Sequence, residues 1–479
     1  MTTTAPTRRA ILGERSFSAQ DQRDFAAASC DVNPMHVDAV AARRLLSGRQ
    51  VVHGIHTLMH ALQLWQPGGP IGPWKASCNF ANPVSVGDRV VFQQEDLESG
   101  RTRLTATVDG LDCTEVLIEP APAAGEPRGL TSGLPTRVVG ALAAPLDETP
   151  GSQTGSLIEL VPGSDALDRA FPRAAAFLGA GGLAALAGLS YFVGMVCPGQ
   201  HSVFSSLQFG PGLDAPAPLR FEVRRYDPRF RLFTVAYDGP LRGELRAFLR
   251  PPPQPQPGAR EVAAQLQGGE FAGTRSLVIG GSRGLGEITA KILAGGGGDV
   301  VVTYAMGRGD ADAVAADINA QGRGRCTAVP LDLGGPFQGT AGVDPAALDA
   351  VYFFATPRIY NKRSGLFDRG AFDEFVGFYL QRFHELCLWL EGTERSRPLK
   401  VYLPSTVFIT DRPKGMTEYA MAKAAAEVLA DDLNRSLRHV MVVHSRLPRL
   451  ATDQTASILK VEVASNLDAM RAVVRLMTG

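Results

Sequence analysis

The chain has 479 residues, of which 45% are hydrophobic and 20% are charged, so it is long enough for about two to four globular domains. The 48 basic and 48 acidic residues balance, which gives no sign of the basic patch typical of nucleic-acid recognition. The six scattered cysteines include no Cys-x-x-Cys pair, which argues against a zinc cage and a disulfide framework. No apolar core follows the basic N-terminus, as a secretory signal would require. We therefore expect a cytoplasmic protein that does not bind nucleic acid.

The stretch SCDVNPMHVD, residues 29–38, places Asp31, Asn33 and His36 around Pro34, which disfavours a regular helix there. A metal site, a turn or helix cap, and an acid–base pair would each use these residue types. As an acid–base pair, the carboxylate and the imidazole would share a water or a hydroxyl, one taking a proton and the other placing it. The spacing alone leaves all three interpretations open.

A helix is predicted over residues 54–65, because Ile55, Leu58, Met59, Leu62 and Trp65 recur at helical spacing. At its start, Gly54 can present a backbone N–H, aided by the helix dipole, to a developing enolate oxygen. The spacing of His53, His56 and His60 would allow a zinc site on one helical face. No Cys, Asp or Glu shares that face, so we do not expect a metal.

Two strand-like runs, DRVVFQQEDL and RTRLTATVDG, follow this helix. The segment then recurs 129 residues later, since Phe80 matches Phe209, Phe92 matches Phe221 and Asp109-Gly110 matches Asp238-Gly239. We therefore expect two similar halves, residues 1–125 and 126–250, each with a helix wrapped by a sheet. At the positions of Asp31 and His36 the second half has Leu160 and Asp165, so we expect it to be non-catalytic.

Residues 174–197 contain no charge and are long enough to span a bilayer. They are rich in Gly and Ala, however, and the 129-residue offset aligns residues 183–195 with the helix of the first half. The sequence therefore favours a wholly buried helix and no membrane span.

A proline-rich stretch, PPPQPQPGAR, predicts an extended linker over residues 251–270. Beyond it, residues 271–479 alternate strand-like runs with helical patterns, which predicts a parallel sheet with helices on both faces. The expected strands are RSLVIGG, DVVVTYA, LDAVYFFA, LKVYLPS and HVMVVHSRL.

Two patterns in this block carry chemistry. The turn VIGGSRGLG follows a strand and opens a helix, where Gly280, Gly284 and Gly286 would let a pyrophosphate approach the helix N-terminus. Tyr419 and Lys423 lie four residues apart on a helical stretch, and an ammonium beside a phenol lowers the pKa of the phenol.

The block resembles the short-chain dehydrogenase/reductase family, in particular its 3-oxoacyl thioester reductases, through GGSRGLG, the PLDL that contains Asp332, Ser405, and YAMAK. The resemblance implies that Tyr419 is the general acid, that Lys423 binds the nicotinamide ribose, and that Ser405 orients the substrate carbonyl. No acidic residue ends the second strand, whereas two arginines lie nearby, which favours NADP(H). The implied cofactor-binding residues are Gly280, Ser282, Arg283, Gly284, Leu285, Gly286, Arg308, Asp332 and Lys423.

This block departs from the family in three places. Ala355-Thr356-Pro357 stands where the family has Asn-Ala-Gly, and Tyr379 stands where the family has a catalytic asparagine. The chain also stops before a last strand through which many relatives associate, which leaves a homo-oligomer possible but its form open. A domain that binds the cofactor without turning it over stays an alternative.

The N-terminal string from FAAASCDVNPMHVD to VVHG, with NPVSVGDRV downstream, resembles the MaoC-like (R)-specific enoyl-thioester hydratases and dehydratases of the hot dog fold. The resemblance implies that Asp31 and His36 are catalytic, that Asn33 supports the carboxylate, and that Gly54 polarises the thioester carbonyl. The expected architecture is an α+β double hot dog followed by an α/β Rossmann domain.

The two resemblances imply consecutive reactions, because reduction of a 3-oxoacyl thioester yields the 3-hydroxyacyl thioester that a dehydratase consumes. We therefore expect a bifunctional reductase and dehydratase of fatty acid or polyketide-type biosynthesis, acting on CoA- or carrier-protein-bound chains. Hydration followed by oxidation, in the degradative direction, is the alternative.

Overall fold

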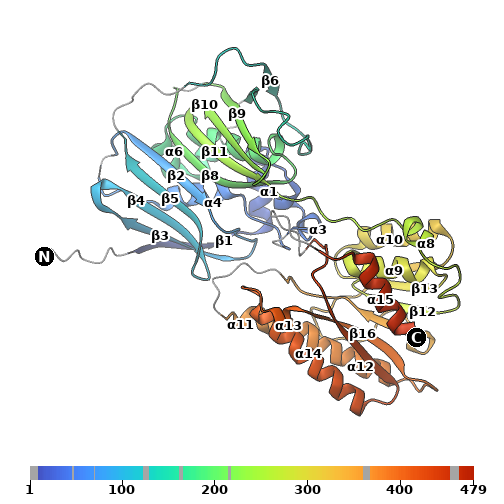
Figure 1. Ribbon diagram of the computed structural model, residues 1–479. Helices are drawn as coiled ribbons and strands as arrows, with labels where there is room; N and C mark the ends of the chain where they lie inside the picture. Colours follow the sequence, from blue (N-terminus) through green and yellow to red (C-terminus); the bar gives the residue numbers. More distant parts are fainter. Residues whose placement is uncertain are drawn as a thin grey trace. The chain divides into compact units, whose positions relative to one another are not determined.

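The structure, a computed structural model, describes residues 9–45, 48–69, 71–121, 129–160, 166–213, 217–359, 367–453 and 463–478. Asp165, at the position that corresponds to His36, lies outside these ranges. The described chain forms two compact units, which divide between Pro252 and Pro253 (Figure 1).

The first unit contains the two expected halves. The first half comprises β1 (Ala10–Ser16), α1 (Ala19–Ser29), α2 (Pro34–Val37), α3 (Ala39–Ala42), α4 (Gly54–Leu64), β2 (Trp74–Phe80), β3 (Arg89–Asp96), β4 (Thr102–Val108) and β5 (Leu111–Pro120). The second comprises β6 (Thr136–Val139), β7 (Leu157–Leu160), α5 (Ala166–Ala170), α6 (Pro172–Leu178), α7 (Gly182–Tyr191), a π-helical turn (Phe192–Val196), β8 (Ser202–Pro211), β9 (Leu219–Asp227), β10 (Leu232–Asp238) and β11 (Leu241–Leu249).

All of these strands join one sheet, in the order β1-β3-β4-β5-β2-β8-β11-β10-β9-β7-β6. The order mirrors itself about the antiparallel pair of β2 and β8, where Ala76 lies opposite Phe209. The central helices α4 and α7 contact each other and share one hydrophobic core, to which Leu58 and Leu186 belong. The mirrored strands confirm the double hot dog fold, while the expected boundaries of the two halves stay predictions.

The apolar segment of the second half is not the single helix that the sequence predicted. It breaks at Gly179 and Gly181, which have φ values of 79° and 73°, a region that side chains rarely adopt. The two parts, Pro172–Leu178 and Gly182–Val196, meet at 97°. Among the described residues no single helix is long and apolar enough to cross a membrane, although this bent pair reaches that length and composition. Most side chains of α7 are buried inside the unit.

The second unit has the expected parallel sheet, in the order β14-β13-β12-β15-β16-β17. The strand β14 was not predicted, because Arg325–Pro330 shows neither a long apolar run nor strict alternation. The predicted linker also contains a helix, α8 (Ala259–Ala264), whose Ala259 and Val262 join the core of the unit. The elements after α8 are β12 (Arg275–Ile279), α9 (Gly284–Gly295), β13 (Asp299–Tyr304), α10 (Arg308–Gln321), β14 (Arg325–Pro330), β15 (Ala350–Phe353), α11 (Arg369–Val376), a π-helical turn (Gly377–Arg382), α12 (Phe383–Glu391), β16 (Leu399–Thr406), α13 (Phe408–Asp411), α14 (Thr417–Ser436), β17 (Val440–Leu447) and α15 (Asn466–Thr478).

Two histidines of α4 are part of the core of the first unit. The ring of His56 stacks on Phe25 with a centroid separation of 4.5 Å, and His60 packs edge-on against Phe171 at 4.9 Å. Burial lowers the pKa of both histidines to about 3. These rings therefore stay neutral and apolar in their contacts at neutral pH.

This burial makes the stability of the first unit depend on pH. Between about pH 6.5 and pH 3 the unfolded chain binds protons at His56 and His60 that the folded chain does not bind, so the free energy of unfolding falls as the pH falls. Each histidine contributes about 1.4 kcal/mol per pH unit to this slope. In urea titrations across this window, His60→Gln should show a shallower slope than the parent protein; an unchanged slope would contradict the assignment.

Candidate active sites

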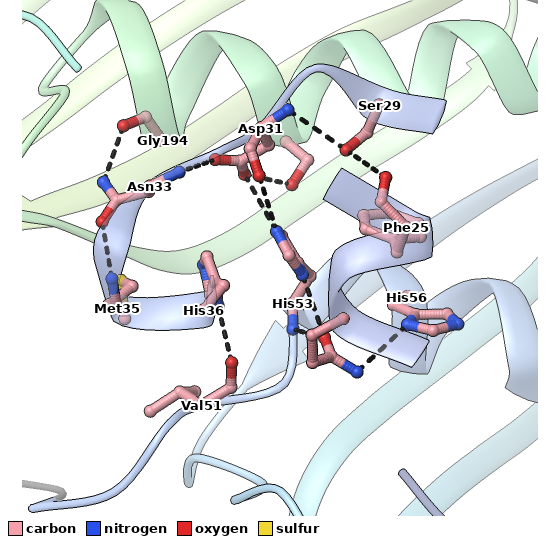
Figure 2. A network of polar contacts seen from close by, with 12 residues as sticks. Phe25, Ser29, Asp31, Asn33, Met35, His36, Val51, His53, His56 and Gly194 are labelled. Carbon is pink, nitrogen blue, oxygen red and sulfur yellow. Dashed lines mark hydrogen bonds and ion pairs between the residues drawn. The ribbon is translucent and has the colours of Figure 1, made fainter. Parts of the chain in front are cut away.

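Three polar side chains of the first unit lie close together: Asp31 of the turn between α1 and α2, His36 of α2, and His53, which precedes α4 (Figure 2). The helix α1 ends at Cys30, whose φ of 61° turns the chain, and Pro34 opens α2. As a result, one ligand-type atom from each of Asp31, His36 and His53 lies within 4.8 Å of the others.

Asp31 is buried against the central helix of the second half. Its Oδ2 accepts a hydrogen bond from Ser190 Oγ at 2.7 Å, and its Oδ1 accepts one from the Asn33 backbone N–H at 3.3 Å. A Cβ at Gly194 would lie 2.3 Å from Oδ1, so this contact requires a glycine. Burial raises the pKa of Asp31, while His36 opposes the rise.

The ring of His36 is held in one tautomer. Its Nδ1 lies 2.6 Å from the carbonyl oxygen of Val51; a carbonyl only accepts, so Nδ1 carries the proton and donates it. The Nε2 of a neutral ring then keeps its lone pair. Burial lowers the pKa of His36, and Asp31 opposes the fall. An imidazole base thus lies beside a carboxyl group whose pKa is raised.

Asn33 does not act on the carboxylate in the expected way. Its side-chain Nδ2 donates to the carbonyl of Gly194 at 2.7 Å, and its Oδ1 accepts from the Met35 N–H at 3.2 Å. Support for Asp31 comes instead from the backbone N–H of Asn33. The amide therefore fastens the turn between α1 and α2 to the second half of the fold.

Gly54 is the first residue of α4, and no side chain caps this helix. A Cβ at Gly54 would lie 3.0 Å from the ring of Phe80, so the close packing of this ring requires a glycine. The uncapped helix start is consistent with a backbone donor for a thioester oxygen.

The histidine triplet considered as a metal site does not form, because His56 and His60 face aromatic rings. Within the described ranges, the group compact enough for a metal is Asp31, His36 and His53. Both ring nitrogens of His53, however, already lie 3.0 Å from oxygen atoms, those of Gln22 Oε1 and the Asp31 carbonyl. Coordination would have to break one of these contacts.

In the second unit, the glycine turn after β12 has the form that a pyrophosphate requires. Gly280 and Gly284 have φ values of 79° and 59°, and a Cβ at Gly286 would lie 2.3 Å from the carbonyl oxygen of Gly280. No side chain caps α9, so the amides of its first turn, which begins at Gly284 and Leu285, are left for an anion. Ser282 is buried within this turn. These residues fit a dinucleotide.

The residues expected to select NADP(H) lie near the carboxyl ends of the strands. Arg308 starts α10 beyond β13, and its side chain is 78% exposed and 3.4 Å from Asp312. Arg283, the N-cap residue of α9, lies 3.2 Å from Asp453. Asp332 follows β14 and accepts a hydrogen bond from the Gly334 N–H at 2.8 Å. Arg308 is thus the more accessible of the two arginines.

Tyr419 and Lys423 are both buried on α14, but their interaction differs from the prediction. Lys423 Nζ donates to the Pro404 carbonyl at 2.7 Å and lies 3.6 Å from the ring centroid of Tyr379, against 5.9 Å from that of Tyr419. Burial lowers the pKa of Lys423 to about 7 and raises that of Tyr419 to about 12. The predicted lowering of the tyrosine pKa is therefore wrong for the protein without its cofactor, because burial dominates.

The hydroxyl of Ser405, which the resemblance assigns to the substrate carbonyl, is bound to another side chain in the structure. This hydroxyl donates to Glu427, which is also bound by Arg446. The side-chain hydroxyl that acts on Tyr419 is that of Thr406, which lowers the pKa of this tyrosine against the larger effect of burial. Successive residues of a strand point to opposite faces, so only one of these two neighbours can face the tyrosine. Thr406 takes the place that was assigned to Ser405.

Comparison with known proteins supports the two-part organisation. Residues 3–112 match the family described as MaoC like domain. An uncharacterized oxidoreductase of Methylorubrum extorquens is 32% identical over 117 residues, which are 24% of this chain and 45% of that relative. The chain thus spans less than half the length of this curated relative.

Solved structures similar to the chain include a short chain dehydrogenase and an alternative dihydrofolate reductase. The NADP complex of a short chain dehydrogenase from Burkholderia cenocepacia shares 24% identity and a TM-score of 0.35, over 43% of this chain and 91% of that one. The NADP complex of FolM alternative dihydrofolate reductase 1 from Brucella canis shares 18% identity and a TM-score of 0.36, over 44% and 89%. The chain thus carries at its N-terminus a region that matches the MaoC like domain, followed by a second unit built on a six-stranded parallel sheet.

Proposed function

We propose that the protein reduces a 3-oxoacyl thioester with NADPH and dehydrates the resulting 3-hydroxyacyl thioester. The observation that carries this proposal is the buried pair of Asp31 and His36, in which a neutral imidazole lies beside a carboxyl group of raised pKa. The substrate would be bound to CoA or to an acyl carrier protein, in fatty acid or polyketide-type biosynthesis.

Dehydration needs one group that takes the α-proton and one that protonates the leaving β-hydroxyl. His36 Nε2 has the lone pair for the first task, because Nδ1 is bound to Val51. Asp31 would deliver the proton for the second, and burial raises its pKa, which favours transfer of a proton onto this carboxylate. The N–H of Gly54 would stabilise the enolate oxygen that forms between the two transfers.

Reduction would take place at the carboxyl end of the parallel sheet of the second unit. NADPH, when bound, supplies the hydride; Gly280, Gly284, Gly286 and Arg308 would hold its phosphates. Tyr419 would protonate the ketone oxygen, and its buried phenol carries the proton over a wide pH range. Thr406 would orient the same oxygen. The absence of an acid after β13 supports NADPH, and this preference favours reduction over the degradative direction.

A combined assay with a 3-oxoacyl thioester, NADPH and mass detection of products tests both activities. Tyr419→Phe should reduce NADPH oxidation about 100- to 10,000-fold, because the general acid is lost. Asp31→Asn should leave NADPH oxidation intact and let the 3-hydroxyacyl product accumulate. NADPH binding without turnover in the parent protein would instead support a non-catalytic cofactor-binding domain, and enoyl substrates converted only in the hydration direction would support the degradative alternative.

The neighbouring hydroxyls of β16 provide a matched pair of variants. Thr406→Val should lower kcat for reduction by about 100-fold or more, because the donor beside Tyr419 is lost without loss of volume. Ser405→Ala should change kcat little, since this hydroxyl bonds to Glu427. The reverse order of effects would restore the original assignment of Ser405.

A further inference from the structure

His53 has an acceptor at each ring nitrogen. Its Nδ1 lies 3.0 Å from Gln22 Oε1, and its Nε2 lies 3.0 Å from the carbonyl oxygen of Asp31 (Figure 2). The Asp31 carboxylate is also near, with Oδ2 3.9 Å from Nε2. The His53 side chain is completely buried, so no bulk water relieves these contacts.

The orientation of the Gln22 amide is fixed by a group that can only donate. The backbone N–H of His53 lies 3.1 Å from Gln22 Oε1, and turning the amide over would put an NH2 group against this N–H. The present orientation also lets Gln22 Nε2 approach His56 Nδ1, at 3.5 Å. An oxygen therefore faces His53 Nδ1.

Neither neutral tautomer of His53 satisfies this arrangement. With the proton on Nδ1, the lone pair of Nε2 faces the Asp31 carbonyl; with the proton on Nε2, the lone pair of Nδ1 faces Gln22 Oε1. A buried acceptor opposite another acceptor loses its hydrogen bond without replacement. Only the doubly protonated ring donates at both nitrogens.

We propose that His53 holds, in the resting site, the proton that Asp31 delivers to the leaving hydroxyl. The carboxylate of Asp31 is then ionised at rest, with Ser190 Oγ and the Asn33 N–H as its donors. His53 acts as a positioning residue that stores the acid proton. This inference rests on the dehydratase function proposed above.

The proton balance of the step is closed. One proton passes from His53 Nε2 to Asp31 Oδ2 and on to the β-oxygen, the carbon–oxygen bond breaks, and a water molecule forms in the site. His36 Nε2 takes the α-proton as the carbon–carbon double bond forms. The proton gained by His36 returns to His53 through this water before the water leaves, which restores the resting state.

Some of the groups around His53 lower its pKa, and others raise it. Burial holds the pKa of His53 well below its usual value, and a charge on His36 or His56 lowers it further, whereas the hydrogen bond to the Asp31 carbonyl raises it. The ring of His36 lies 3.8 Å from that of His53, and burial lowers the pKa of His36, which favours its neutral form. Arg250 also lowers the pKa of His36, while Cys30 and Asp31 act on the phenol of Tyr191. Because burial raises the pKa of Asp31 as well, the pair retains one proton, and the two acceptors around the ring place it on His53.

The charge state of His53 can be measured directly by 15N NMR of the full-length protein labelled at histidine. At pH 7 both ring nitrogens of His53 should show protonated shifts, assigned by their loss in His53→Gln, with His56→Gln as the control for a neighbouring ring. One non-protonated nitrogen on His53 would overturn the proposal. This readout does not need turnover, so it separates the proposal from the dehydratase function itself.

The pH profile of dehydration provides the kinetic test. In His53→Gln the basic limb of kcat/KM should move to lower pH, because the pair loses one of its two proton-holding groups. Gln22→Glu should move this limb to higher pH, since a carboxylate in the same place stabilises the doubly protonated ring. A purely structural role would lower the rate in both variants without shifting the limb, and that result would contradict the proposal.

Discussion

The turn that holds Asp31 and Asn33 contacts the end of α7 and the residues that follow it, and the arrangement of the candidate site in the first unit depends on this contact. Asn33 Nδ2 binds the Gly194 carbonyl, and Ser190 binds the Asp31 carboxylate. Both contacts are buried, and a buried polar group left without a partner costs about 1–3 kcal/mol. The turn therefore has its functional shape only when the two halves are packed around their shared core.

This constraint explains which features could be predicted from the sequence. The order of elements follows from local patterns and the 129-residue offset, so the two halves and the parallel sheet could be predicted. Ser190 and Gly194 could not, because they meet Asp31 across about 160 residues of chain and no local pattern marks them. The sequence also could not predict which side chains of β16 face Tyr419. Ser405 and Thr406 are adjacent residues with hydroxyl groups, and only the register of β16 decides which of them acts on this tyrosine.

In the second unit, burial lowers the pKa of Lys423 and raises the pKa of Tyr419, so it favours the neutral form of both side chains. Lys423 lies over the ring of Tyr379, where the family has an asparagine, and Tyr379 bonds in turn to Thr356 of the unusual Ala355-Thr356-Pro357 segment. The two departures noted in the sequence are thus in contact with each other. An aromatic face in place of a polar amide attracts a cation but offers Lys423 no hydrogen-bond relay.

The pairing of β2 with β8 has a consequence for how this protein can change over generations. When two identical copies of a chain assemble, every substitution appears on both sides of the interface at once. Here the halves are covalently joined and differ in sequence, so Ser190 and Gly194 of one half can contact Asp31 of the other without a matching contact in the opposite direction. A substitution that alters the surroundings of Asp31 can therefore arise in either of two distant stretches of the chain.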